Sequence, residues 1–254
     1  MYFRPKFRGR FSTFSVVTVK SLVTTHHALA EAFITRYTIP VNDALLIAGT
    51  GKELITALAD EGGKRGAKTA ISLIPSQNGH NRLAEGLNAL DWNPGSPISA
   101  YNLVLSAENR IGALNGGIIV CAAPDNADAA DFSPAGIDFI VNNHIKSYMF
   151  LAHELTRRFR AGQSGALALV LLEEASSGLL TGPVFSTFKS FTSNLLEDLN
   201  TEYFRAAAFS CEEKNSIPMS EFAAYIFKTL YEAKKLDGGR WFKFTKLKHN
   251  LKLT

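Results

Sequence analysis

Residues 44–59, ALLIAGTGKELITALA, constrain the fold of this chain more than any other stretch. The apolar run Ala44–Ala48 is followed by the turn Gly49-Thr50-Gly51 and then by apolar residues at helical spacing. A buried strand, a glycine turn and a helix form the first unit of a βαβ fold that cradles a nucleotide phosphate. The stretch therefore predicts an α/β protein with a parallel sheet.

Strand-like and helix-like segments alternate from residue 44 to the end of the chain. We expect strands at 44–48, 67–74, 89–92, 118–123, 166–172, 205–209 and 240–244. After the helix that follows residue 51, we expect further helices at 98–111, 137–159, 187–203 and 220–234, with Gly116-Gly117 as a turn before a strand. Continuously apolar strands indicate a sheet that is covered on both faces. The pattern predicts one Rossmann-like, doubly wound parallel sheet over residues 43–254.

In such a sheet, ligands bind beyond the carboxyl ends of the strands, near the point where the strand order reverses. Residues 49–52 and 122–124 fall at two such ends. The chain has two cysteines and no cluster of cysteine and histidine, so no zinc site is expected. Its longest apolar runs fall short of the roughly 18–20 residues of a membrane helix, so we expect no membrane span.

The N-terminal extension of residues 1–42 is basic. Residues 1–30 contain no Asp or Glu, five Lys or Arg and seven Ser or Thr, a composition typical of a mitochondrial transit peptide. The alternative is a basic arm that stays on the protein and contacts a partner. The C-terminus also lacks acidic residues from Arg240 onward. We expect localisation in the mitochondrial matrix, or otherwise in the cytoplasm, and contacts to a larger complex through the two basic ends.

The order and spacing of the segments resemble the short-chain dehydrogenase/reductase family over about residues 43–245. The resemblance implies a Rossmann fold and NAD(P)-dependent oxidoreductase chemistry. It also implies a homo- or hetero-oligomer formed through the helices near 137–159 and 187–203. Aromatic residues on these helices are candidates for that contact, namely Tyr148, Phe150, Phe188 and Phe191.

The family's glycine loop has the form TGxxxGxG, and its first glycine is matched here by Gly49. Glu53 and Ile55 occupy the second and third glycine positions, and Gly51 is out of register. The resemblance makes Gly49, Thr50 and Gly51 candidate cofactor-binding residues. However, a carboxylate at Glu53 would repel a pyrophosphate at the helix N-terminus. We therefore expect NAD(P) to bind weakly or not at all.

Three further landmarks of the family fall on the middle of the chain. Asp91 matches an aspartate that contacts the adenine, although turn chemistry before Asn93-Pro94-Gly95 explains an aspartate equally well. Cys121–Pro124 stands where the family has NNAG, and only the alanine agrees. Asn143, within VNNHIKSYMF, matches the context of the family's helix asparagine, with Asn142 beside it.

The family's catalytic YxxxK pair is altered in this chain. Lys189 is in place, but Phe185 stands at the tyrosine position and has no ionisable proton. Ser176 or Ser177 is the candidate for the family's serine. Lys189 is a candidate catalytic and cofactor-binding residue, with a surface lysine as the alternative. A second YxxxK, Tyr231 to Lys235, falls on the last helix, where we expect it to lie far from the cofactor edge.

Three functions follow from these observations. The first is a catalytically degenerate protein that acts as a structural or regulatory subunit of a mitochondrial assembly, because several landmarks are altered in separate segments. The second is a divergent NAD(P)H-dependent carbonyl or ketoacyl reductase that uses Lys189 with Ser176 or Ser177. The third is an RNA-binding component that uses the basic ends of the chain.

Overall fold

The computed structural model of the chain describes residues 43–74, 88–124, 132–173, 179–201, 203–212, 217–233, 236 and 241–245. All of them belong to one compact unit that spans residues 39–254. The N-terminal extension, the segment with Ser176 and Ser177, and the C-terminal tail after residue 245 lie outside the described residues. The expectations for these segments stay predictions.

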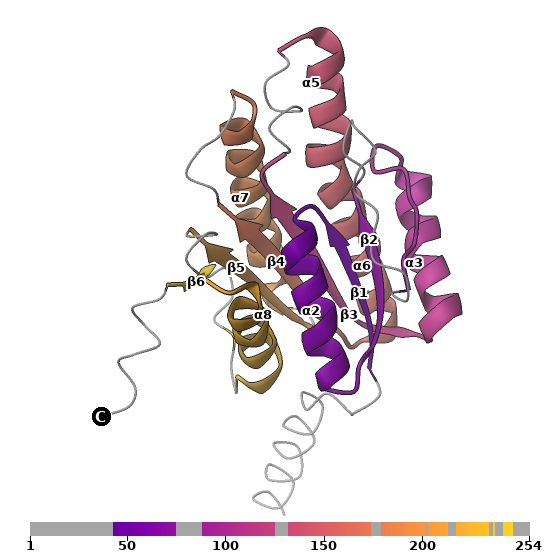
Figure 1. Cartoon of the computed structure of the whole chain (residues 1–254). Helices are drawn as coiled ribbons and strands as arrows, with labels where there is room; N and C mark the ends of the chain where they lie inside the picture. The colour runs from indigo at the N-terminus through magenta and orange to yellow at the C-terminus, as the bar shows by residue number, and fades with distance from the viewer. Residues whose placement is uncertain are drawn as a thin grey trace, which may run out of the picture. The chain divides into compact units, whose positions relative to one another are not determined.

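The centre of the fold is a six-stranded sheet in the order β2-β1-β3-β4-β5-β6 (Figure 1). All neighbouring strands are parallel. The strands are β1 (Ala44–Gly49), β2 (Lys68–Leu73), β3 (Leu114–Ala122), β4 (Ala166–Leu172), β5 (Arg205–Cys211) and β6 (Trp241–Phe244). This order confirms the doubly wound parallel sheet that the sequence predicts.

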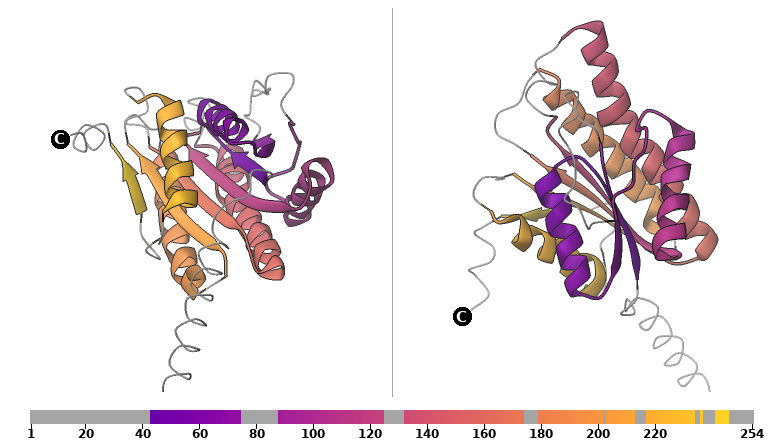
Figure 2. Two further views of the ribbon diagram at one scale, coloured as in Figure 1. Left: turned by 90° about the horizontal axis from the view of Figure 1, so that it is seen from below. Right: turned by 45° about the vertical axis from the view of Figure 1, so that its right-hand side comes forward.

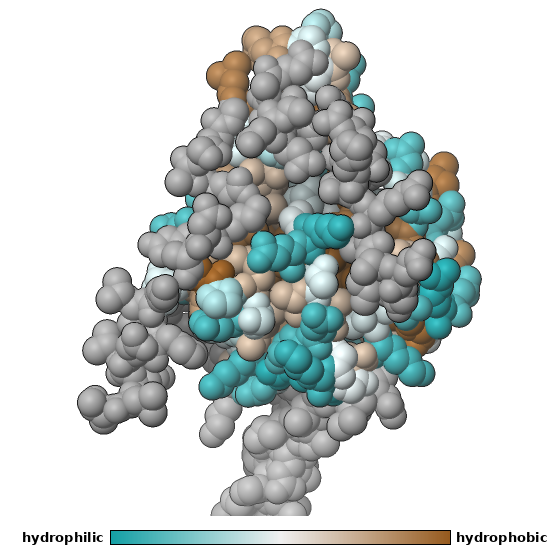
Figure 3. Space-filling model, viewed as in Figure 1, coloured by the Kyte–Doolittle hydropathy of each residue, from teal (hydrophilic) through white to brown (hydrophobic). Residues whose placement is uncertain are grey.

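Helices cover both faces of the sheet (Figure 2). One face carries α2 (Lys52–Lys64) and α8 (Met219–Phe227) with its π-helical continuation η3 (Lys228–Glu232). The other face carries α3 (Pro97–Ile111), α6 (Ser147–Gly162) and α7 (Thr181–Asp198), which ends in the 3₁₀ turn η2 (Leu199–Thr201). The outward side of α2 is hydrophilic (Figure 3). No helix in the described part of the chain is long and apolar enough to cross a membrane.

Side chains of the strands enter the two helical layers alternately. Leu45 and Ile47 of β1 belong to the core beside α2 and α8, whereas Leu46 and Ala48 belong to the core beside α3, α6 and α7. Every residue of β1 and of β4 is buried. The continuously apolar strand sequences are therefore explained by burial on both faces.

The strand expected at 89–92 is reduced to a single parallel bridge between Ile71 and Ala89. The amide of Leu90 donates to Ile71, and then the chain leaves the sheet. Asn93 and Pro94 explain the departure. Asn93 accepts a hydrogen bond from the Gly95 amide at its side-chain oxygen, and Pro94 has no amide hydrogen to continue a ladder.

The turn expected at Gly116-Gly117 is wrong, because both glycines lie inside β3. They allow close packing against the sheet. A Cβ atom on Gly117 would lie 2.5 Å from Leu155 Cδ1, and one on Gly116 would lie 2.6 Å from the Tyr231 hydroxyl. Tyr231 of the second YxxxK therefore lies near the amino end of β3, at the end of the sheet opposite Gly49, whereas Lys235 lies outside the described residues.

The helix expected at 137–159 is longer and interrupted. It consists of α5 (Pro134–Ile140), the π-helical segment η1 (Val141–Lys146) and α6. The helix expected from residue 187 is α7, which begins six residues earlier, at Thr181. Gly182 and Pro183 conceal this start in the sequence. Pro183 lies in the first turn, where its missing amide hydrogen costs no helical hydrogen bond.

Two of the four aromatic residues expected at an oligomer contact belong to the core. Tyr148 and Phe188 are buried, and their rings pack edge to face with centroids 4.8 Å apart. Phe150 and Phe191 are partly buried against the same core. Only Phe150 and Phe191 of the four therefore keep surface for a contact with another chain.

Substitution of Gly117 by Ala should destabilise the protein. The added methyl group forces Leu155 and α6 away from β3, and overpacking of this kind typically costs about 1–3 kcal/mol. Gly63→Ala is the matched control, because a Cβ atom there meets nothing within 4 Å. Gly63 lies in the last turn of α2, so alanine there should stabilise the protein by less than the roughly 0.5–1 kcal/mol typical of mid-helix. Urea unfolding measures both changes, and equal effects of the two variants would contradict this packing role.

Candidate functional site

The strand order reverses between β1 and β3. The chain passes from β1 to β2 on one side, and then to β3 on the other side of β1. At their carboxyl ends, Gly49 of β1 pairs with Val120 of β3. The structure therefore brings residues 49–52 and 122–124 together at the place where ligands of doubly wound folds bind.

The glycine turn is tied directly to β3. The Thr50 amide donates to the Val120 carbonyl at 2.9 Å. The Thr50 hydroxyl accepts from the Ala122 amide at 2.6 Å and donates to the Ala122 carbonyl at 3.2 Å. Gly49 has φ +139°, and a Cβ atom there would lie 1.9 Å from the Val120 oxygen. Gly49 and Thr50 are thus required by the junction of the two strands, whether or not a ligand binds.

Helix α2 begins directly after this turn. Gly51 precedes its first turn with φ +84°, and a Cβ atom there would lie 2.9 Å from the Ala122 side chain. Glu53 is exposed in the first turn, where a carboxylate stabilises the positive end of a helix. Ile55 is fully buried in the core. The two positions that are glycine in the family thus hold a carboxylate at the helix N-terminus and a side chain that fills the helix–sheet interface.

Phe185 and Lys189 lie one helical turn apart on α7. The Phe185 side chain is 9% exposed and belongs to the core that includes Val184 and Phe188. The Lys189 ammonium donates to Glu173 Oε2 at 2.8 Å. Glu173 is the first residue after β4. Lys189 is therefore a half-exposed, ion-paired lysine, and the ring at the tyrosine position is packed inward.

Sequence reasoning missed Glu173 and a second ion pair beside it. Glu212 follows β5, and its carboxylate accepts from Lys243 of β6 at 2.9 Å. The bond from Lys243 lowers the pKa of Glu212, and the charge of Lys189 adds to that effect. The same bond raises the pKa of Lys243, with a smaller contribution from Glu173. The signal was present in the sequence, because both glutamates directly follow buried neighbouring strands.

Asp91 and Asn143 lie in neighbouring parts of the structure. Asp91 is exposed and follows the bridge at Ala89, and Asn143 is half-buried in the π-helical segment. The turn after Asp91 packs against that segment, because a Cβ atom on Gly95 would lie 3.1 Å from Asn142 Cβ. Asn142 itself accepts a hydrogen bond from Lys146 Nζ at 2.9 Å.

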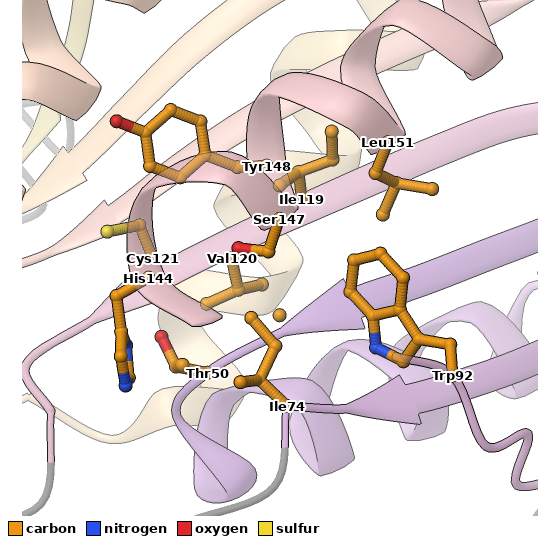
Figure 4. A pocket seen from close by; sticks show the side chains of 11 residues that line it. Thr50, Ile74, Trp92, Ile119, Val120, Cys121, His144, Ser147, Tyr148 and Leu151 are labelled. Carbon is orange, nitrogen blue, oxygen red and sulfur yellow. The ribbon is translucent and has the colours of Figure 1, made fainter. Parts of the chain in front are cut away.

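A small cavity lies beside the junction of β1 and β3 (Figure 4). Its polar lining comes from Thr50, Trp92, Cys121, His144, Ser147 and Tyr148. Burial raises the pKa values of the Cys121 thiol and the Tyr148 phenol and lowers the pKa of His144 to about 4. All three groups are thereby held in their neutral forms. Tyr148 is therefore poorly suited to replace the missing tyrosine, because an acid–base catalyst needs a pKa near the working pH.

The described residues offer a dinucleotide a poor fit in the family's usual pose. The glycine turn is bonded to β3, the helix N-terminus carries Glu53, and Lys189 is paired with Glu173. The cavity beside Thr50 has a volume of about 10 Å³, which is too small for a nucleotide. No described group of three or more His, Cys, Asp or Glu residues is placed to hold a metal ion.

Comparison with solved structures identifies the fold. A short-chain dehydrogenase/reductase oxidoreductase from Brucella ovis, in complex with partially ordered NAD, has a TM-score of 0.60 at 14% identity. The comparison covers 80% of this chain and all of that one. The chain has the short-chain dehydrogenase/reductase fold. The resemblance that the sequence suggested is confirmed at the level of structure.

Two other structures with this fold are similar. The 3-ketoacyl-(acyl-carrier-protein) reductase from Brucella melitensis, complexed with NADH, has a TM-score of 0.61 at 12% identity, over 80% of this chain and 97% of that one. The enoyl-[acyl-carrier-protein] reductase from Aquifex aeolicus has a TM-score of 0.61 at 18% identity, over 79% and 94%. No protein-family model matches the sequence, and no curated protein matches it.

The buried His144 should make stability depend on pH. Its folded-state pKa of about 4 lies below the ordinary 6.5, so the unfolded chain binds the proton more readily. Stability should therefore fall as the pH drops from about 6.5 toward 4, by up to roughly 3 kcal/mol. His144→Phe should flatten this part of the profile, and the exposed His153→Gln should not. Urea midpoints across this pH range measure the effect, and an unchanged profile in His144→Phe would contradict it.

Proposed function

We propose that this protein is a non-catalytic member of the short-chain dehydrogenase/reductase fold that serves as a structural or regulatory subunit of a larger assembly. The observation that carries the proposal is the state of the Phe185–Lys189 pair. Phe185 is a buried core residue, and Lys189 forms an ion pair with Glu173. A phenyl ring cannot exchange a proton with a carbonyl oxygen, so the acid–base step of a reductase has no donor at this position.

The glycine turn supports the same proposal. Gly49, Thr50 and Gly51 all have structural reasons for their identity, since they join β1, β3 and α2 at close range. Such contacts preserve a glycine turn without any demand from a cofactor. Glu53 adds a negative charge where a pyrophosphate would need a positive field. The packing function of the turn thus remains, and its electrostatic function does not.

The helices α6 and α7 offer the surface for assembly. Met149 and Phe150 of α6 and Phe191 and Leu195 of α7 are partly buried side chains that border the core. Apolar side chains of this kind complete their burial when another chain covers them. We propose a homo- or hetero-oligomeric contact here. The acid-free N-terminal residues favour a mitochondrial assembly.

The alternative is a divergent NAD(P)H-dependent reductase. It is favoured by the likeness to structures that contain NAD or NADH, and by Lys189 itself. In that case Lys189 would leave Glu173 and contact a cofactor ribose, and water with Ser176 or Ser177 would supply the proton. The two proposals are distinguished by turnover. A reductase should oxidise NAD(P)H at a measurable rate, whereas a non-catalytic protein should not.

The wild-type protein should show no NAD(P)H-dependent reduction of carbonyl or ketoacyl substrates. Phe185→Tyr should restore none, and neither should Phe185→Tyr combined with Glu173→Gln, because the glycine turn remains unsuited to the cofactor. Oxidation of NADH and NADPH followed by absorbance provides the measurement. A saturable turnover of the wild type that Lys189→Ala abolishes would support the reductase instead.

The full-length protein should form an oligomer or co-purify with a partner when isolated from its own cells. Phe150→Ser combined with Phe191→Ser should reduce the assembled mass, because both side chains border the proposed contact. Tyr203→Ser is the control, since Tyr203 is exposed and lies before β5. Light scattering after size exclusion gives the masses. A wild-type monomer at every concentration, without a co-purifying chain, would overturn this part of the proposal.

A further inference from the structure

The cavity beside the β1–β3 junction is surrounded by polar atoms without partners. Trp92 Nε1, both ring nitrogens of His144, Ser147 Oγ and the Tyr148 hydroxyl have no hydrogen-bond partner within the described part of the chain. The four side chains are between 1% and 8% exposed. Folded proteins seldom leave buried polar atoms unsatisfied, so several beside one cavity indicate that something else bonds to them.

These atoms come from two separate parts of the chain. Trp92 follows the bridge at the edge of the sheet, whereas His144 belongs to η1 and Ser147 opens α6. In Figure 4, the indole nitrogen of Trp92 and the hydroxyl of Ser147 point to the side on which Ile74 and His144 lie. An occupant of this cavity would therefore link the turn after Asp91 to the long interrupted helix.

The volume of the cavity and the charge of its lining limit what can occupy it. The cavity has about 10 Å³ for the centre of a water-sized molecule, which is about one probe sphere. None of the residues that line it is charged, and His144 is held neutral by burial. The occupant is therefore uncharged and very small. A nucleobase or a nicotinamide ring does not fit unless Trp92 or His144 moves.

The hydrogen-bonding chemistry narrows the choice further. An indole N–H only donates, so the occupant must accept a bond from Trp92. A neutral imidazole has one donor and one acceptor nitrogen, and hydroxyls do both. The occupant must therefore be able to accept and to donate within one atom's volume. Water meets both conditions.

We propose that this cavity is a binding site for a single water molecule, held by Trp92 and Ser147. The water is an integral part of the fold, because it satisfies buried groups that the protein atoms leave unpaired. It joins the turn after Asp91 to the start of α6, beside the carboxyl ends of β1 and β3. The proposal does not depend on whether the protein is an enzyme.

The two tryptophans provide an internal control. Trp241 Nε1 donates to Ser193 Oγ at 3.1 Å, whereas Trp92 Nε1 has no protein partner in the described residues. In nuclear magnetic resonance spectra of the full chain, the Trp92 indole proton should show a cross-peak to a long-lived water. The Trp241 indole proton should show none, because Ser193 already accepts its bond. Trp92→Phe and Trp241→Phe assign the two signals.

Ser147→Val provides the second measurement. Its added methyl group occupies the water's space, so the cross-peak between the Trp92 indole proton and water should disappear. The amide proton signals of the folded protein should remain unchanged. If this variant does not fold, the wild-type spectrum still decides. A Trp92 indole proton without any water contact in the folded wild type would overturn the proposal. So would a crystal structure in which a larger molecule fills the cavity with Trp92 displaced.

Discussion

The contact between Gly49 and Val120 determines how the rest of this structure can be arranged. With no Cβ atom at Gly49, the chain can leave β1 directly against the backbone of β3. Thr50 then fixes the two strand ends to one another through both polar groups of Ala122. This junction fixes where α2 begins, beside the carboxyl ends of β1 and β3. The turn is thus a structural joint between the two strands, whether or not it also contacts a ligand.

Charged side chains at the carboxyl end of the sheet also interact with groups of the protein itself. Glu53 stabilises the N-terminus of α2, and Glu173 and Glu212 pair with Lys189 and Lys243 at the ends of neighbouring strands. A cofactor would have to break the Lys189 pair and approach the Glu53 carboxylate before it gained any contact.

Packing determined what the sequence could predict. The apolar runs of β1 and β4 predicted buried central strands, because parallel strands need apolar residues on both faces. The π-helical segment Val141–Lys146 was not predicted, because the apolar spacing over residues 137–159 indicated one continuous helix. Gly116 and Gly117 were misinterpreted because glycine signals a turn and a close approach equally well.

The candidate site was only partly predictable. The positions of Gly49, Phe185 and Lys189 followed from the resemblance to the family's motifs. The partners that decide their roles did not, because Glu173 and Val120 are distant in sequence and are brought near only by the order of the strands. No sequence pattern singled out His144, and only its burial beside Trp92 and Ser147 distinguished it.

Cofactor binding tests the central claim most directly. Calorimetric titration of the full-length wild-type protein with NADH and with NADPH should show no saturable binding in the micromolar range, since the junction, Glu53 and the Lys189–Glu173 pair all oppose it. Saturable micromolar binding of either cofactor, with quenching of Trp92 fluorescence, would contradict the account.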